Sequence, residues 1–239
     1  KGYALMVDES VFIHHYGSQT FKANRIDILD NLKERIPIFQ NKWPDVDYNE
    51  LLEIKNPLDK LHSDLINRGI NDLDNSDFSS AEKHFLQILK DNPISEEALY
   101  GLVLCNRNFG NKIMAMEYIK HLLQVNSNHA EALNQFGLIL VEDSNFTDAK
   151  NALVSAIENA PDFIEAQRNL AELYILEEDF NTGIQAYLTI LKNHPEDIPS
   201  LLRMAELNRE ADNTKEASEW AKLVLKLEPE NPLASQFVS

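Results

Sequence analysis

The chain has 239 residues, enough for one large domain or two small ones, and 44% of them are hydrophobic, enough for a buried core. Its 22 basic and 39 acidic residues give a formal charge of −17, which disfavours nucleic acid and anionic lipid as partners, because both need Lys and Arg for attraction. A single cysteine, Cys105, excludes an intrachain disulfide, and no apolar run reaches the roughly 18 residues that a membrane span needs.

The first 48 residues follow a pattern of their own. An extended segment runs to His15, Gly17 interrupts it, and residues 24–43 then carry apolar side chains at helical spacing. A strand at residues 3–14 would leave backbone groups unpaired beside apolar side chains. We therefore expect either disorder there or dimerisation through this strand.

Three short motifs at 1–3 (KGY), 11–21 (VFIHHYGSQTF) and 39–43 (FQNKW) resemble the C-terminal end of the catalytic domain in family-2 glycosyltransferases of the GT-A type. The resemblance implies that residues 1–48 are a remnant of such a domain, and that this chain alone transfers no sugar and holds no cofactor. For the parent enzyme it implies a divalent cation, Mn²⁺ or Mg²⁺, with His15 as one ligand. The alternative is that one of the two adjacent histidines packs inward and the other faces solvent, as strand alternation requires.

Residues 49–61 are expected to be a linker and the start of the first helix. Asn56 and Pro57 supply an N-cap and a first-turn proline, so this helix should begin near residue 57. At the other end, residues 232–239 are expected to be a tail or the start of a capping helix.

Between these segments, small residues and prolines return every 34 residues. Small residues let two antiparallel helices approach closely, and proline ends the second helix of each pair. No pair can bury its apolar face alone, so the pairs must stack on one another. The series are Pro93, Pro161, Pro195 and Pro229, with Ser127 at the position between the first two; Ala81, Ala115, Ala149, Gly183 and Ala217; and Gly69, Val103, Gly137, Ala171 and Ala205.

This pattern resembles the tetratricopeptide repeat (TPR) over residues 62–231. The resemblance implies an all-α fold, a right-handed superhelical solenoid of about five helix pairs behind the short N-terminal extended segment and helix. It also implies a concave groove, lined by the first helix of each repeat, that binds a polypeptide or protein partner in the cytoplasm. The five repeats are expected at 62–95, 96–129, 130–163, 164–197 and 198–231.

Repeat position also selects residues for the groove. Tyr100 and the arginines are the expected anchors, because they combine contact area with fixed hydrogen-bond geometry. Asn67, Gln135 and Asn169 either hold a peptide backbone, as an asparagine ladder does in TPR-bearing glycosyltransferases, or are ordinary polar residues on a solvated helix face. The full set is Asn67, Tyr100, Arg107, Asn134, Gln135, Arg168, Asn169, Arg203 and Arg209.

Together, the two resemblances favour a TPR array that recruits a polypeptide to a family-2 glycosyltransferase. The alternative is a non-enzymatic TPR scaffold for the assembly of protein complexes. The residues after Leu61 hold 14 basic and 29 acidic side chains, which favours basic or neutral extended peptides over acidic ones. The run Glu177-Glu178-Asp179 is interpreted as a solvated charge cluster at a helix end.

Overall fold

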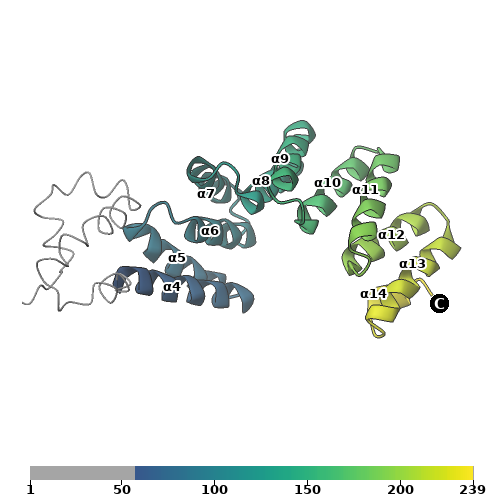
Figure 1. The fold of residues 1–239 in the computed structure, drawn as a ribbon, viewed down its shortest axis with the longest axis horizontal. Helices are drawn as coiled ribbons and strands as arrows, with labels where there is room; N and C mark the ends of the chain where they lie inside the picture. The colour runs from purple at the N-terminus through teal and green to yellow at the C-terminus, as the bar shows by residue number, and fades with distance from the viewer. Residues whose placement is uncertain (1–56, 239) are drawn as a thin grey trace, which may run out of the picture. The chain divides into compact units, whose positions relative to one another are not determined.

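A computed structural model describes residues 57–238, with side chains from Leu61 onward, and in this part of the chain it has eleven α-helices and no strand (Figure 1). The predicted all-α solenoid is therefore confirmed. The expected segments before residue 57 lie outside the described residues, and with them His15 and the strand at 3–14 through which dimerisation is expected.

Ten of the described helices form five antiparallel pairs that follow one another along the chain. The first helices of the pairs are α4 (Pro57–Asp74), α6 (Glu96–Asn108), α8 (Ala130–Glu142), α10 (Ile164–Leu176) and α12 (Ile198–Glu210). The second helices are α5 (Phe78–Asp91), α7 (Lys112–Val125), α9 (Phe146–Asn159), α11 (Phe180–Asn193) and α13 (Thr214–Leu227), and the short α14 (Pro232–Ser235) follows them.

Each second helix from α5 to α11 packs on the first helix of the next repeat as well as on its own partner. Phe85 of α5 illustrates this, because it is 1% exposed and belongs to one apolar cluster with Leu65 of α4 and Leu102 of α6. A Cβ atom at Gly69 would lie 2.6 Å from the Phe85 ring, and one at Gly101 would lie 2.3 Å from it. The ring thus occupies the space that two missing side chains leave free, and it joins the first two repeats.

The turn inside every repeat contains one residue in the left-handed conformation. Only one of the five is glycine, so four turns hold a side chain where it costs conformational energy. These residues are Ser76 (φ 60°), Gly110 (φ 69°), Ser144 (φ 57°), Glu178 (φ 63°) and Asp212 (φ 61°).

The residue after each left-handed position is Asp or Asn and begins the second helix as its N-cap. In four repeats the side chain accepts a hydrogen bond from a backbone N–H three residues later, which satisfies a donor that the helix itself leaves unpaired. The four are Asp77, Asn111, Asn145 and Asp179.

The predicted charge cluster at 177–179 is exposed and lies at the end of α10, and its three acids have different roles. Glu177 forms an ion pair with Lys150 at 2.8 Å, Glu178 is the left-handed turn residue, and Asp179 caps α11. The hydrogen bonds from Thr182 hold the pKa of Asp179 below its usual value.

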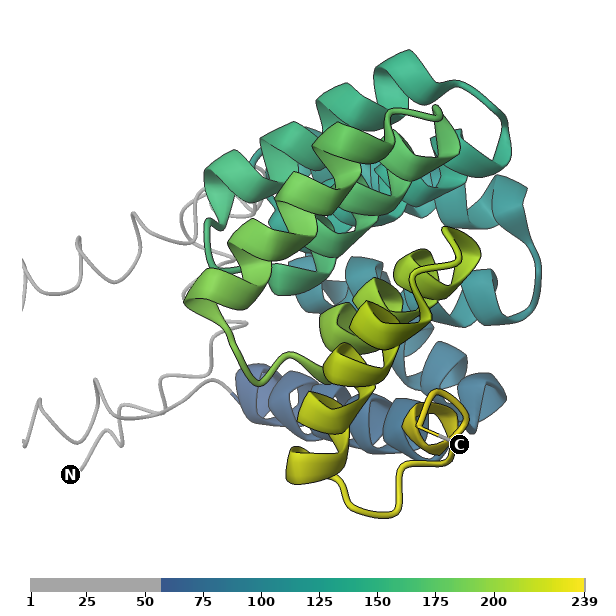
Figure 2. The ribbon, with the colours of Figure 1, turned by 90° about the vertical axis from the view of Figure 1, so that its right-hand side faces the viewer.

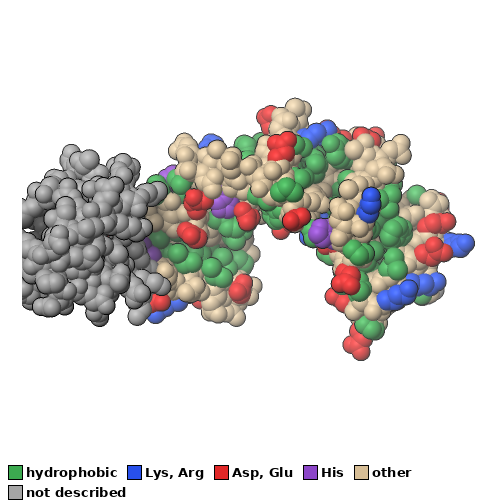
Figure 3. Space-filling view, in the orientation of Figure 1, with side chains coloured by type: hydrophobic (Ala, Val, Ile, Leu, Met, Phe, Trp, Pro, Cys, Tyr) green, Lys and Arg blue, Asp and Glu red, His purple; other side chains and the backbone are tan. Residues whose placement is uncertain are grey.

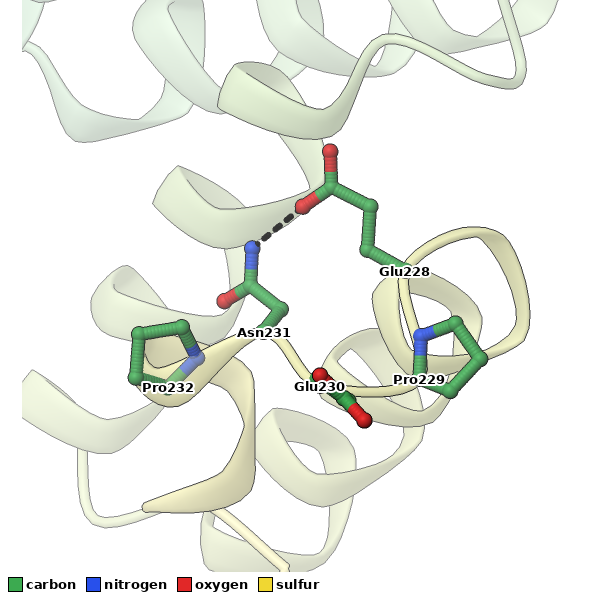
Figure 4. Close-up of a pocket in the computed structure, with 5 residues that line it drawn as sticks. All are labelled: Glu228, Pro229, Glu230, Asn231 and Pro232. Carbon is green, nitrogen blue, oxygen red and sulfur yellow. Dashed lines mark hydrogen bonds between the residues drawn. The ribbon is translucent and has the colours of Figure 1, made fainter.

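After the fifth pair, a turn leads into α14. Asn231 accepts hydrogen bonds from the backbone N–H groups of Leu233 and Ala234, and its own amide donates to Glu228 at 2.7 Å (Figure 4). Ala234 is fully buried, so α14 packs on the end of the array. The turn residues 228–232 line a shallow pocket, and their side chains spread around it without converging (Figure 4).

Candidate functional site

All nine candidate groove residues lie on first helices, as the repeat positions require. Their environments differ along the array. Asn67 and Arg209 are exposed, Asn134 is buried at 1% exposure, and the other six are partly buried.

Three of the four candidate arginines are held by carboxylates of a neighbouring repeat. The Arg107 guanidinium lies 2.7 Å from Glu142 Oε1, and Arg168 lies 2.6 Å from Asp197 Oδ1. Their side chains are only 25% exposed, so these pairs are better shielded from water than ordinary surface ion pairs. The first contact joins the second repeat to the third, and the second joins the fourth repeat to Asp197, the N-cap of the first helix of the fifth pair.

Arg203 is held by a larger cluster. Its Nε donates to Glu172 Oε1 at 2.6 Å, and its Nη1 donates to Glu206 and to Glu210. The Tyr187 hydroxyl donates to the same Glu172 oxygen at 2.6 Å. Burial opposes the charge of Arg203, but the carboxylates outweigh it and raise its pKa above the ordinary value, while burial and then Glu172 raise the pKa of Tyr187.

Asp197 has two tasks in the contact with Arg168. Its Oδ2 accepts from the backbone N–H of Ser200 and so caps α12, while Oδ1 accepts from Arg168. Burial alone would raise the pKa of this carboxyl group, but the hydrogen bonds from Ser200 and Arg168 bring it below its usual value.

The fourth arginine has a different partner. The Arg209 guanidinium lies 4.4 Å from the centre of the Phe237 ring, a cation–π contact, and no carboxylate in the described part of the chain pairs with it. Each of the four predicted arginine anchors is therefore already engaged within the protein.

The asparagines make a partial chain of hydrogen bonds between repeats. The Asn169 amide donates to Asn134 Oδ1 at 2.8 Å, and the Asn134 amide donates to Glu165 Oε1 at 3.0 Å. Asn134 is thus buried in the contact between α8 and α10. In the second repeat Gly101 takes the position that Asn67, Gln135 and Asn169 hold in the other repeats, and the Phe85 ring fills the space that a side chain there would need.

Tyr100 lies in an acidic and aromatic environment. Its ring centroid is 5.4 Å from that of His129, and burial together with Glu165 and Glu131 raises the pKa of its hydroxyl to about 12. Gln135 makes a hydrogen bond with this hydroxyl. The phenol stays neutral at physiological pH and offers an apolar ring beside carboxylates.

Accessible apolar side chains recur on the first helices of the first three repeats. Ile70 is 47% exposed, and Ile66, Leu104 and Leu138 are partly exposed at equivalent or adjacent groove positions. Figure 3 shows hydrophobic side chains at the surface over α4 to α6 with acidic ones among them, whereas over α12 and α13 basic and acidic side chains lie next to each other.

Sequence reasoning did not identify the carboxylates that hold the arginines. A signal was present, because Glu142, Glu172 and Asp197 lie 29 to 35 residues from their arginines, about one repeat away. The spacing alone does not tell whether two such side chains meet, since this depends on the rotation from one repeat to the next.

The described residues hold no metal site and no membrane span. No group of three or more His, Cys, Asp or Glu side chains comes together among them. None of the described helices is both long and apolar enough to cross a bilayer. The cation expected at His15 concerns residues outside those described.

The family model of the tetratricopeptide repeat matches residues 66–120 and 134–198, half of the chain. The chain belongs to the TPR family. Such arrays of helix pairs are protein-interaction modules, and the polypeptide-binding class predicted from the repeats is therefore supported.

Solved structures with TPR-like helix arrays agree with this assignment. PilF of Pseudomonas aeruginosa is 19% identical, with 75% of this chain and 82% of that chain covered and a TM-score of 0.65. A thermophilic TPR protein of Thermus thermophilus is 18% identical, with 74% and 96% covered and a TM-score of 0.64. An O-GlcNAc transferase of Thermobaculum terrenum is 18% identical over 59% of this chain and 27% of that chain, with a TM-score of 0.55. At these identities the likeness concerns the fold alone.

Proposed function

We propose that the TPR array binds a polypeptide segment along α4, α6 and α8, and that this segment carries apolar side chains and positive charge. The observation that supports it best is the contrast between free and engaged side chains. The apolar groove side chains such as Ile70 remain accessible, whereas the arginines that would grip an acidic peptide are occupied by carboxylates.

The charge of the array supports the same class of ligand. Glu131 and Glu165 are exposed next to Tyr100, and the residues after Leu61 carry 14 basic and 29 acidic side chains. A negative field of this kind speeds the approach of basic peptides and repels acidic ones, and salt weakens both effects.

The test is peptide binding with a matched pair of variants. Ile70→Ser removes an accessible apolar side chain from α4, while Ile113→Ser changes an isoleucine that is 77% exposed on a second helix, α7. Burying about half of an isoleucine is worth about 1 kcal/mol, so Ile70→Ser should weaken binding about fivefold and Ile113→Ser should not.

Fluorescence anisotropy with peptides of equal apolar content, one rich in Lys and one rich in Glu, gives the second readout. The basic peptide should bind more tightly at low salt. Equal binding of both peptides, or equal losses in the two isoleucine variants, would contradict the proposal.

We propose further that the array recruits a polypeptide acceptor or assembly partner to a family-2 glycosyltransferase, with His15 as a ligand of Mn²⁺ or Mg²⁺ in that enzyme. The motifs at 1–3, 11–21 and 39–43 support it. We also propose a cytoplasmic location, in keeping with the buried free thiol of Cys105.

The transferase proposal is tested on the natural gene product, with uridine and guanosine diphosphate sugars as donors and Mn²⁺ present. Cation-dependent transfer that His15→Ala abolishes would support it. Residues 1–239 alone should give no transfer and no donor binding in calorimetry. A natural product without transferase activity that still binds peptide would favour the non-enzymatic scaffold.

A further inference from the structure

One ring nitrogen of His129 has two possible partners that exclude each other. His129 is the N-cap of α8, and its Nδ1 accepts a hydrogen bond from the backbone N–H of Ala132 at 3.3 Å. Glu131 Oε2 lies 3.2 Å from the same nitrogen. A neutral ring can accept the N–H at this nitrogen, whereas a protonated ring has no acceptor and can only donate to the carboxylate. The protonation of His129 therefore decides which of the two partners it keeps.

The residue at this cap position differs from one first helix to the next. Histidine is the side chain that ordinarily gains or loses its charge between about pH 5 and pH 8. Among the described first helices from α6 onward and α14, only α8 has a histidine at this position, so the fold does not require one. The other residues there are Ser95, Phe163, Asp197 and Asn231.

His129 lies beside a candidate groove residue. Its ring centroid is 5.4 Å from that of Tyr100, and the same two repeat positions, two repeats later, hold Arg168 and Asp197, which form an ion pair at 2.6 Å. Figure 2, a view from the C-terminal end, shows that the helices change direction from pair to pair, yet this contact recurs. A change of charge at His129 therefore acts directly beside Tyr100.

The charged and titratable groups on the elements around His129 are acidic or neutral. The last turn of α7, which leads into this turn, has no basic residue, and among the described residues His129 is the one ion-pair partner of Glu131. A proton on His129 thus places a new positive charge beside Tyr100 and Glu131. The surrounding groups are Glu131 on α8, Tyr100 on α6, Glu96 on α6 through its hydrogen bond from Asn126, Glu158 in the last turn of α9 and Glu165 on α10.

We propose that His129 is a proton-controlled selector of the charge of the bound ligand, an inference that rests on the proposed binding of a basic polypeptide. When His129 is neutral, it caps α8 and leaves Glu131 to a Lys or Arg side chain of the ligand. When His129 is protonated, it pairs with Glu131 itself and repels that side chain. The groove therefore releases basic ligands as the pH falls.

Fluorescence anisotropy at pH 8 and pH 5.5, at constant ionic strength, tests the proposal with two peptides of equal apolar content. One peptide carries Lys and the other carries Gln at the same positions. We expect the affinity for the Lys peptide to fall about fivefold on acidification, the size of one lost charge interaction, while the Gln peptide keeps its affinity. The variant His129→Asn should bind the Lys peptide equally well at both pH values.

The fold should survive His129→Asn, because asparagine is a good N-cap and Asn231 caps α14 at the same repeat position. His121→Asn is the matched control, because His121 is a partly exposed histidine on the second helix α7 and its removal should leave the pH response unchanged. Glu131→Gln should weaken binding of the Lys peptide at pH 8 and reduce its dependence on pH.

NMR of the free protein tests the same exchange of partners without a peptide. The amide signal of Ala132 should move as the His129 ring titrates, because its hydrogen-bond acceptor is lost. An Ala132 amide that does not respond, or a His129→Asn variant that keeps the pH response of the parent, would overturn this inference while the proposed function stands. If neither peptide binds at any pH, the proposed function fails, and the selection of ligands by His129 fails with it.

Discussion

Leu104 and Glu172 occupy equivalent positions two repeats apart, yet they have different surroundings. Leu104 is a partly exposed apolar side chain on α6, whereas Glu172 on α10 accepts hydrogen bonds from Arg203 and Tyr187. This groove position is thus open to a ligand in the second repeat, whereas in the fourth it joins one repeat to the next. A position in the repeat does not by itself define a binding residue.

The largest expected effect concerns the apolar core between the first two repeats. Phe85→Ala removes a ring that is 1% exposed and should lower the free energy of unfolding by about 3–5 kcal/mol. Urea titration followed by circular dichroism measures it.

Gly101→Ala is the companion variant, because its Cβ would lie 2.3 Å from the Phe85 ring. Alone it should destabilise the array through overpacking, but in the Phe85→Ala background it should be neutral or favourable, since alanine stabilises a helix by about 1 kcal/mol over glycine. Additive effects of the two changes would show that the ring does not fill this space.

A smaller effect on the free energy of unfolding, and one that depends on pH, is expected at the ion pair between Arg168 and Asp197. Because the folded-state pKa of Asp197 is lowered, its ionised carboxylate contributes stability above the unfolded pKa, about 4, and the contribution is lost as the pH falls through the folded value. Arg168→Met should therefore cost about 1–2 kcal/mol at pH 7 and nearly nothing once Asp197 is protonated.

Arg209→Met is the control for this experiment, because Arg209 contacts the Phe237 ring and has no carboxylate partner among the described residues. Urea titrations at a series of pH values should show a pH-dependent loss for Arg168→Met only. A loss that stays the same as the pH is lowered until Asp197 is protonated would assign the effect to packing of the Arg168 stem.

The smallest effect on stability concerns the left-handed turn residues, and it should be the same in early and late repeats. Ser144→Gly relieves a left-handed serine, and after the entropy that glycine gains in the unfolded chain we expect a stabilisation of about 0.5 kcal/mol. Ser76→Gly and Asp212→Gly should give similar gains in thermal unfolding. Gly110→Ala, with φ 69°, should instead cost about 1 kcal/mol.

The helix pairs were predictable because the small residues Gly69, Ala81 and their equivalents recur at fixed spacing. Repeat position also placed all nine groove candidates on first helices. The pairing of Arg107, Arg168 and Arg203 was not predictable, because a contact across one repeat depends on the rotation between repeats and on side-chain conformation.

The burial of Asn134 was missed for a related reason. An asparagine at a groove position looks available to a ligand, but its two hydrogen bonds to Asn169 and Glu165 make it part of the contact between repeats. The left-handed serines were missed because glycine is the usual residue in that conformation. Of the five left-handed turn residues, only Gly110 is a glycine that the sequence makes recognisable.

The contacts of Phe85, Arg107, Asn134 and Arg168 all join adjacent repeats. Coupling of this kind reaches only from one neighbour to the next, so the array resembles a row of linked elements more than a single cooperative globule. Under a pulling force the array would extend and then recover its length elastically. The weakest contact between two repeats would open first. A polypeptide segment bound across several repeats would stiffen those repeats and transmit tension to the repeats beyond them.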